Sequence, residues 1–206
     1  MDETLEKWEE LIDGQAVVFN RCPSLNHNTI TLNLCCVFGS YLRGKKEIRP
    51  FQHFDAWLTE KDHFIPDFAI VCNRDKIKRT HVKGAPDFVI EILSPSTAKR
   101  DRGYKKDVYE RCGVREYWIV SPEGLYVEQY VLENGAFVLR DVYQHYRAYE
   151  LEDLTEKEKR KLSRKSAPQF SMTLQSLWKK CFTTGERKGA AKSYGKRKIQ
   201  PRCPGL

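Results

Sequence analysis

Two acidic residues lie inside apolar segments that are predicted to be β-strands, and they are the first candidates for chemistry. Glu91 interrupts the apolar run Phe88–Leu93, and Asp67 lies in the segment Phe64–Cys72. Burying a carboxylate is costly unless it meets a cation, a hydrogen-bond donor or a metal ion. Because neighbouring strands lie ~4.8 Å apart, pairing in a suitable register would bring both acids to one ion. A divalent ion such as Mg²⁺ or Mn²⁺, held by carboxylates, can activate water for attack on a phosphodiester.

A second Pro-Asp pair, Pro86-Asp87, competes with Pro66-Asp67 for this role. Asp87 is on the same face of the predicted strand as Glu91, because side chains alternate along a strand. Four residues at ~3.3 Å each separate the two positions by ~13 Å, whereas Mg²⁺ binds its ligands at ~2.0–2.1 Å. We therefore expect Asp87 to mark the start of the strand and Asp67 to be the metal ligand.

A cation beside the two acids would neutralise charge or orient the nucleophile. The position two residues beyond Glu91 on the same strand face is Leu93, so the strand itself supplies no cation. Lys105, on the helix predicted to follow, is the nearest replacement. Arg102, three residues earlier on the same helix flank, is a second candidate. The opposing interpretation is that Lys105 is an exposed lysine that pairs with Asp101 at i,i+4.

His27 is a candidate of another kind, near the start of a predicted helix. Pro23-Ser24 opens this helix with Ser24 as its N-cap, and the helix is predicted to end near Gly44. Its apolar face would carry residues at helical spacing, namely Ile30, Leu34, Val37 and Tyr41. His27 is either satisfied by local hydrogen bonds or lies at the mouth of a cleft, where it would contact the substrate.

The whole pattern predicts an α/β (α+β) domain, a mixed β-sheet flanked by helices with an N-terminal β-hairpin. The hairpin spans residues 5–20 around Asp13-Gly14, and a second one spans residues 125–143 around Asn134-Gly135. A helix from Ser96 or Thr97 to Cys112 separates the Glu91 strand from a strand at 116–120, so these two strands are expected to be parallel. An exposed charged segment at 154–165 and a strand at 170–174 follow.

Composition limits the classes of function. The 206 residues are 40% hydrophobic, and no run of ~18 apolar residues could span a membrane. The acidic N-terminus lacks the apolar region of a signal peptide, so the sequence predicts a cytoplasmic protein. Its seven cysteines include no CxxC pair and are expected to be free, buried thiols rather than zinc ligands or disulfides.

The net charge of +8 is concentrated at the C-terminus. Residues 183–206 contain seven Lys or Arg residues against one acid, Glu186, while the preceding residues are close to neutral. We therefore expect a domain at residues 5–178 and a disordered basic tail at residues 183–206. The tail would add phosphate affinity that falls with salt, whereas the domain is not a broad polyanion-binding surface.

Several of these motifs together resemble the Uma2 family, which belongs to the PD-(D/E)xK nuclease superfamily and is described as a family of restriction endonucleases. The resemblance runs from about Glu10 to Trp178, and its longest motif surrounds Glu91. The matching motifs are Glu10-Leu11-Ile12-Asp13-Gly14, Pro23-Ser24 to His27, Pro66-Asp67, Gly84 to Thr97, Asp101 to Lys105 with Tyr109, and Gly113 to Trp118.

The resemblance implies a restriction-endonuclease-like fold and cleavage of DNA that depends on Mg²⁺ or Mn²⁺. Asp67 and Glu91 would be the metal ligands, and Lys105 would be the third signature residue, moved to the helix. Glu10 matches an acidic family position that lines the same cleft. The resemblance leaves a homodimer open, and it leaves open whether the nucleic acid is DNA or RNA. It also leaves an alternative function on the same fold, a catalytically inactive module that binds nucleic acid or a protein.

Overall fold

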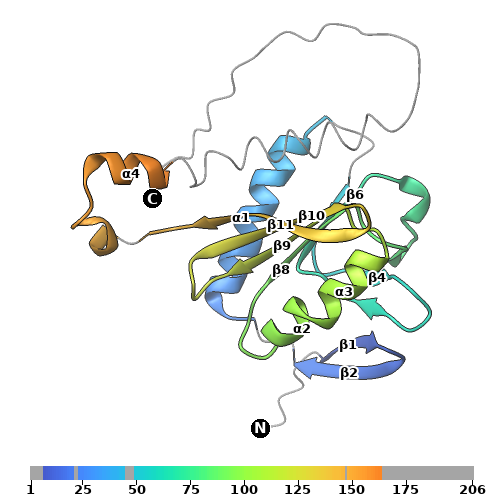
Figure 1. The fold of residues 1–206 in the computed structure, drawn as a ribbon. Helices are drawn as coiled ribbons and strands as arrows, with labels where there is room; N and C mark the ends of the chain where they lie inside the picture. Colours follow the sequence, from blue (N-terminus) through green and yellow to red (C-terminus); the bar gives the residue numbers. More distant parts are fainter. Residues whose placement is uncertain (1–6, 21–22, 45–48, 147, 164–206) are drawn as a thin grey trace, which may run out of the picture. The chain divides into compact units, whose positions relative to one another are not determined.

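The computed structural model describes residues 7–20, 23–44, 49–146 and 148–163 (Figure 1). The predicted strand at 170–174, the domain end at 178 and the basic tail lie outside the described residues. Among the described residues, no helix is long and apolar enough to cross a membrane. The cysteines described there are free thiols, as predicted, but they are not buried: Cys36 is exposed, and Cys35, Cys72 and Cys112 are half-buried.

The chain folds as the mixed α+β structure that the sequence predicts, and all strands among the described residues lie between Lys7 and Gln144. Its strands and helices, in chain order, are β1 (Lys7–Ile12), β2 (Gln15–Asn20), α1 (Leu25–Leu42), β3 (Arg49–Phe51), β4 (Asp55–Trp57), β5 (His63–Phe64), β6 (Phe68–Val71), β7 (His81–Lys83), β8 (Phe88–Ile92), α2 (Ala98–Arg102), α3 (Tyr104–Arg111), β9 (Glu116–Ser121), β10 (Tyr126–Glu133), β11 (Ala136–Gln144) and α4 (Glu156–Ser163).

These strands are divided between two mixed sheets. One is a 5-stranded sheet in the order β2-β1-β5-β4-β7, and the other is a 6-stranded sheet in the order β11-β10-β9-β8-β6-β3. Both predicted hairpins are present, β1–β2 and β10–β11. Each turns at a pair of residues with positive φ, Asp13-Gly14 and Asn134-Gly135, which is the conformation that a tight two-residue hairpin turn requires.

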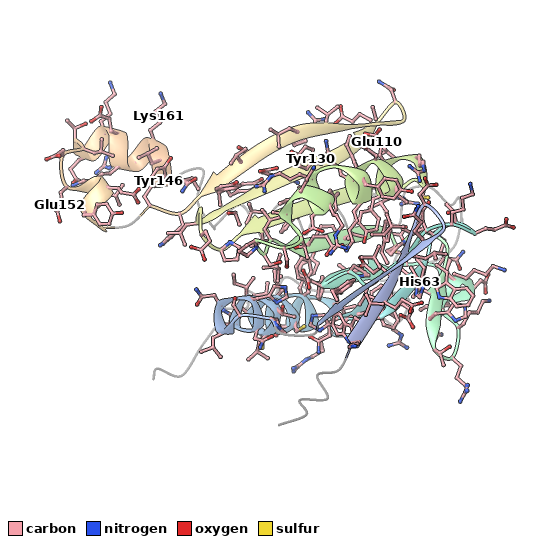
Figure 2. All side chains as sticks on the ribbon, turned by 90° about the horizontal axis from the view of Figure 1, so that it is seen from below. His63, Glu110, Tyr130, Tyr146, Glu152 and Lys161 are labelled. Carbon is pink, nitrogen blue, oxygen red and sulfur yellow. The ribbon has the colours of Figure 1, made fainter. Side chains whose placement is uncertain are left out.

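Strand β8 lies inside the larger sheet and is buried along its whole length. It pairs antiparallel with β6 and parallel with β9, so the α2–α3 segment is the predicted crossover. Helix α1 covers one face of this sheet, where the Phe38 ring lies 4.8 Å from the ring of Phe68 and 5.4 Å from that of Phe88. Figure 2 shows side chains filling the layer between α1 (blue) and the strands.

The buried face of α1 differs from the predicted one. The residues that the helix buries are His27, Thr31, Leu34, Phe38 and Leu42. Val37, predicted to be buried, is 47% exposed. Both sets of residues follow helical spacing and share Leu34, so periodicity alone could not choose between them. The choice is decided by Phe38, whose ring fills the space above the aromatic residues of the sheet.

The predicted strand Phe64–Cys72 is in fact two strands in different sheets. β5 belongs to the smaller sheet and β6 to the larger one, and Ile65-Pro66-Asp67 connects them. Proline has no N–H to donate to a sheet, so a continuous strand through Pro66 would lose a hydrogen bond. The connection places Asp67 where the chain passes from one sheet to the other.

The predicted helix from Thr97 to Cys112 is also divided. Helix α2 ends at Arg102 and α3 begins at Tyr104, because Gly103 has a non-helical backbone (φ −107°, ψ −107°). Thr97 precedes the helix but makes no side-chain capping hydrogen bond. The break means that residues 102 and 105 do not share a helix flank, which affects one of the predicted site residues.

We expect Ser24→Ala to lower the free energy of unfolding by about 1 kcal/mol. The Ser24 hydroxyl accepts a hydrogen bond from the His27 backbone N–H (3.2 Å) and so satisfies a donor at the start of α1. Ser40→Ala, an exposed change in the last turn of the same helix, should alter stability by less than about 0.5 kcal/mol. Urea unfolding of the two variants checks this, and equal midpoints would contradict the capping role.

Candidate active site

Asp67 and Glu91 lie side by side at one end of the β6–β8 pair. Phe68 is registered with Ile90, so Asp67, one residue earlier, lies across from Glu91. Residues across from each other in an antiparallel pair point to the same side of the sheet. The Asp67 backbone N–H donates to Glu91 Oε2 (3.4 Å), and the Ile92 backbone N–H donates to Asp67 Oδ2 (2.7 Å). The strand pair therefore brings the two predicted ligands together.

Asp87 lies at the start of β8, at the other end of the same strand pair. Its carboxylate accepts a hydrogen bond from the Cys72 backbone N–H (2.8 Å) and lies 3.6 Å from Arg115 Nε. No ion pair or hydrogen bond joins it to Glu91 or Lys105 in the described parts of the chain. Asp87 thus fastens one strand to the other, in agreement with its predicted position.

Lys105 is buried, with only 4% of the residue exposed. Its Nζ lies 2.8 Å from Glu10 Oε1, 3.2 Å from Glu91 Oε1 and 3.8 Å from Asp101 Oδ1. The interpretation of Lys105 as an exposed helix lysine is therefore wrong, although the pairing with Asp101 exists. We call the acids Glu10, Asp67, Glu91 and Asp101, together with Lys105, the acidic cluster.

Glu10 brings the smaller sheet into this cluster. It lies on β1, is fully buried, and its Oε1 accepts a hydrogen bond from the Ile65 backbone N–H (2.8 Å). Its Oε2 is buried and has no hydrogen-bond partner among the described residues. Because buried polar atoms are rarely left unpaired, this oxygen is a natural place for a cation or an ordered water.

The cluster contains more buried acids than cations. Burial raises the pKa of the Glu91 carboxyl well above its ordinary range, Lys105 opposes the rise, and the charges of Asp101, Asp67 and Glu10 add to it. Burial also raises the pKa of Asp101, again against Lys105. The pKa of Lys105 itself is raised, because Glu91, Glu10 and Asp101 outweigh the effect of burial. Lys105 therefore stays protonated, and the repulsion among the buried carboxylates appears as raised pKa values of Glu91 and Asp101.

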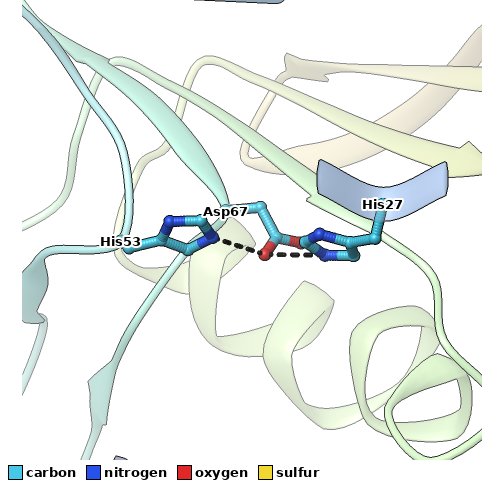
Figure 3. A group of neighbouring side chains, drawn as sticks. All are labelled: His27, His53 and Asp67. Carbon is cyan, nitrogen blue, oxygen red and sulfur yellow. Dashed lines mark ion pairs between the residues drawn. The ribbon is translucent and has the colours of Figure 1, made fainter. Parts of the chain in front are cut away.

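Asp67 experiences a different environment from Glu91. Its Oδ1 lies 3.0 Å from His27 Nε2 and 3.6 Å from His53 Nε2, and the two imidazoles flank the carboxylate (Figure 3). Burial would raise the pKa of Asp67, but hydrogen bonds from both histidines, the charge of His27 and the Ile92 N–H lower it to about 2. Asp67 is therefore ionised at neutral pH, as a metal ligand must be.

His27 is buried and contacts the site through its ring. Its backbone N–H donates to Ser24 Oγ, which is the predicted local hydrogen bond, and its Nε2 lies 3.0 Å from Asp67 Oδ1. Contact of His27 with a substrate stays a prediction. Burial lowers the pKa of His27, but the hydrogen bond and charge of Asp67 and the charge of Asp101 outweigh it and raise the pKa.

Arg102 makes its polar side-chain contacts with residues outside the acidic cluster. Its guanidinium donates to Tyr126 OH (2.6 Å) and to Glu128 Oε1 (3.1 Å), both on β10. The expectation that it shares a helix flank with Lys105 is wrong, because the break at Gly103 separates the two residues.

Three residues of the site were not selected from the sequence. Tyr109, on α3, donates to Glu91 Oε1 (2.9 Å). It lies one turn after Lys105, so the spacing within the helix could have indicated it. Asp101 was considered only as a surface partner of Lys105. His53 lies between short strands, and no local pattern indicates that it would contact Asp67.

Comparison with known proteins agrees with this architecture. The model of the Uma2 family, described as "Putative restriction endonuclease", matches residues 2–163. An uncharacterized protein of Synechocystis sp. is 28% identical over 131 residues, which are 63% of this chain and 68% of that protein. The crystal structure of a "putative nuclease belonging to DUF820" from Anabaena variabilis is similar, with a TM-score of 0.54 at 20% identity, over 66% of this chain and 76% of that one.

At that identity the crystal structure shows a common fold. The family match covers most of the chain, including both sheets, all the helices named above and every residue of the acidic cluster. The chain therefore belongs to the Uma2 family, as its motifs indicate.

Proposed function

We propose that this protein is a metal-dependent endonuclease that hydrolyses phosphodiester bonds of DNA. The observation that carries the proposal is the convergence of Asp67 and Glu91 from two paired strands, beside the buried ammonium of Lys105. Two carboxylates and a lysine in contact are the groups that phosphodiester hydrolysis with a divalent ion uses.

The residues fit a divalent cation such as Mg²⁺ or Mn²⁺. Carboxylate oxygens are the ligands that these ions prefer, and Asp67 has a pKa of about 2, so it is ionised. The acidic cluster has four carboxyl groups against one lysine, and the pKa of Glu91 is raised by burial and further by its acidic neighbours. When bound, the ion would neutralise this charge, activate water and stabilise the negative charge that develops on the phosphate.

The chain's own residues prepare Glu91 for this role. Its Oε1 accepts hydrogen bonds from Lys105 and Tyr109, which fixes the rotation of the carboxylate. Among the described residues, its Oε2 makes only the longer contact with the Asp67 N–H (3.4 Å), so this is the oxygen that we assign to the ion. Lys105 is thus a positioning residue for Glu91, and the fully buried Glu10 supports Lys105 rather than touching the polynucleotide.

The test is cleavage of supercoiled plasmid by the full chain with Mg²⁺ or Mn²⁺, with an EDTA control and a matched RNA substrate. We expect the protein to produce nicked or linear plasmid only when the metal ion is present. The chain contains its own matched pair of variants, Asp67→Asn and Asp87→Asn, since both acids follow a proline and fasten the same two strands. Asp67→Asn should lower cleavage about 10–100-fold or more, and Asp87→Asn should retain it.

Two results would count against the proposal. Wild-type protein that shifts DNA in a gel but does not cut it with either metal would favour the binding module on the same fold. Equal loss of cleavage in Asp67→Asn and Asp87→Asn, at equal stability, would contradict the assignment of Asp67 as the ligand.

A further inference from the structure

His27, His53 and Asp67 form a compact group of potential metal ligands, with one imidazole on either side of the Asp67 carboxylate (Figure 3). One ligand atom from each residue lies within 4.8 Å of the other two. Both imidazoles direct Nε2 at the same carboxylate oxygen, Asp67 Oδ1. The other oxygen, Oδ2, accepts the Ile92 N–H, so the histidine side of Asp67 is distinct from the strand side.

Separate backbone features hold each histidine in place. His27 lies in the first turn of α1, where its backbone N–H donates to Ser24 Oγ. His53 has a positive φ of 46°, its backbone N–H donates to the Pro66 carbonyl (3.2 Å), and its ring lies 5.0 Å from the Trp8 ring. A positive φ is uncommon for a residue other than glycine, and histidine is among the residues that adopt it more often. The group is therefore assembled by parts of the chain that are far apart in the sequence.

The spacing of these atoms suits a metal with nitrogen ligands. Zn²⁺ binds imidazole nitrogen and carboxylate oxygen at ~2.0–2.2 Å, so adjacent ligand atoms around it lie ~3.0–3.5 Å apart. The two contacts of Asp67 Oδ1, 3.0 Å and 3.6 Å, agree with that spacing to within small side-chain shifts. Two histidines with one carboxylate is a ligand set of first-row transition metals, whereas Mg²⁺ prefers oxygen.

A hydrogen-bond network that served only packing would be expected to satisfy the buried ring nitrogens. His27 Nδ1 is buried and has no hydrogen-bond partner among the described residues, so the ring makes its polar side-chain contact through Nε2 alone. The His27 ring is therefore oriented so that its Nε2 lies near Asp67 Oδ1, the same atom that His53 Nε2 approaches.

We propose that His27, His53 and Asp67 bind a divalent transition-metal ion such as Zn²⁺ or Co²⁺, through Nε2, Nε2 and Oδ1. This site differs from the Asp67–Glu91 site, because it uses two histidine nitrogens and Asp67 Oδ1 and does not include Glu91. Binding of a metal ion at this site does not depend on whether the protein cleaves DNA.

The test is titration of the metal-free full chain with Co²⁺, followed by visible absorption, and with Zn²⁺, followed by calorimetry, in the absence of DNA. We expect one Co²⁺ ion per chain, displaced by Zn²⁺ and not by equimolar Mg²⁺. His27→Ala and His53→Asn should each weaken Co²⁺ binding at least about tenfold, with asparagine chosen because it tolerates the positive φ. His63→Ala, a histidine paired instead with Asp55, should bind Co²⁺ as the wild type does.

The outcomes separate this inference from the proposed nuclease. Co²⁺ binding that survives in both histidine variants but disappears in Glu91→Gln would place the ion at the strand side and overturn the inference, while the proposed function stands. A Co²⁺ spectrum dominated by thiolate charge transfer would also overturn it, since it would assign the ion to cysteines. Circular dichroism verifies that each variant is folded. If one histidine variant does not fold, the other still tests the site.

Discussion

Lys105→Met is expected to lower the free energy of unfolding by about 3–5 kcal/mol at neutral pH, the usual effect of removing one partner of a buried ion pair. The lysine is the only ammonium in contact with Glu10, Glu91 and Asp101 in the part of the chain that the structure describes. Its loss would leave several carboxylates buried without compensation. Chemical unfolding at pH 7 in EDTA measures the change.

The next residue provides the matched control. Lys106 is half-buried, and its Nζ lies 4.3 Å from the centre of the Tyr130 ring, outside the acidic cluster. Lys106→Met should therefore cost about 1 kcal/mol or less. Lys105→Met combined with Glu91→Gln should be less destabilised than the sum of the two effects, because both side chains belong to one charge network. A Lys105→Met protein as stable as Lys106→Met would show that the ammonium does not compensate the acids.

Glu91→Gln is expected to have opposite effects on activity and on stability. The pKa of Glu91 is raised well above 4.5 in the folded protein, so the folded state favours the neutral carboxyl. Above the unfolded-state pKa, the unfolded chain loses its proton first, and the wild type loses stability as pH rises towards the folded-state pKa. Glutamine does not titrate. In EDTA, Glu91→Gln should match the wild type near pH 4 and be increasingly more stable at higher pH, by up to about 1.4 kcal/mol per pH unit.

Metal reverses this order under the proposed function. Mn²⁺ would bind the ionised Glu91 and stabilise the wild type, but not the variant, by mass action. Plasmid cleavage by Glu91→Gln should fall by about 100–1,000-fold, the scale of losing one electrostatic stabiliser of a transition state. Thermal unfolding between pH 4 and pH 8, with and without Mn²⁺, together with cleavage, tests both halves. A variant less stable than wild type at pH 8 in EDTA would contradict the charge argument.

The local features of this fold could be predicted from the sequence because they depend on neighbouring residues. Asp13-Gly14 and Asn134-Gly135 specify hairpin turns, Ser24 caps a helix, and an apolar run specifies β8. The distance along one strand was sufficient to reject Asp87 as a partner of Glu91, since that distance depends only on strand geometry.

The remaining features depend on contacts between distant segments. Nothing near Lys105 indicates that Glu10, which lies 95 positions earlier, would be within 2.8 Å of it. The buried face of α1 depends on how Phe38 packs against the sheet. The position of His53 depends on the hydrogen bond from its backbone N–H to the Pro66 carbonyl. Pro66 and Gly103 were visible as breaks, but a break does not specify where the chain goes next.

The two Pro-Asp pairs are related by the local twofold symmetry of the antiparallel β6–β8 pair. Asp67 and Asp87 each precede a strand and accept an N–H from the end of the other. Under that symmetry the residue equivalent to Glu91 is Val71, which is apolar and fully buried. The same arrangement, an aspartate that accepts a backbone N–H from the neighbouring strand, is therefore present at both ends of the pair. Only Asp67 has a second acid, Glu91, across from it. Asp87 therefore shows the structural role that such an aspartate has in this strand pair. Any difference in activity between Asp67 and Asp87 variants then reports a role of Asp67 beyond joining the strands.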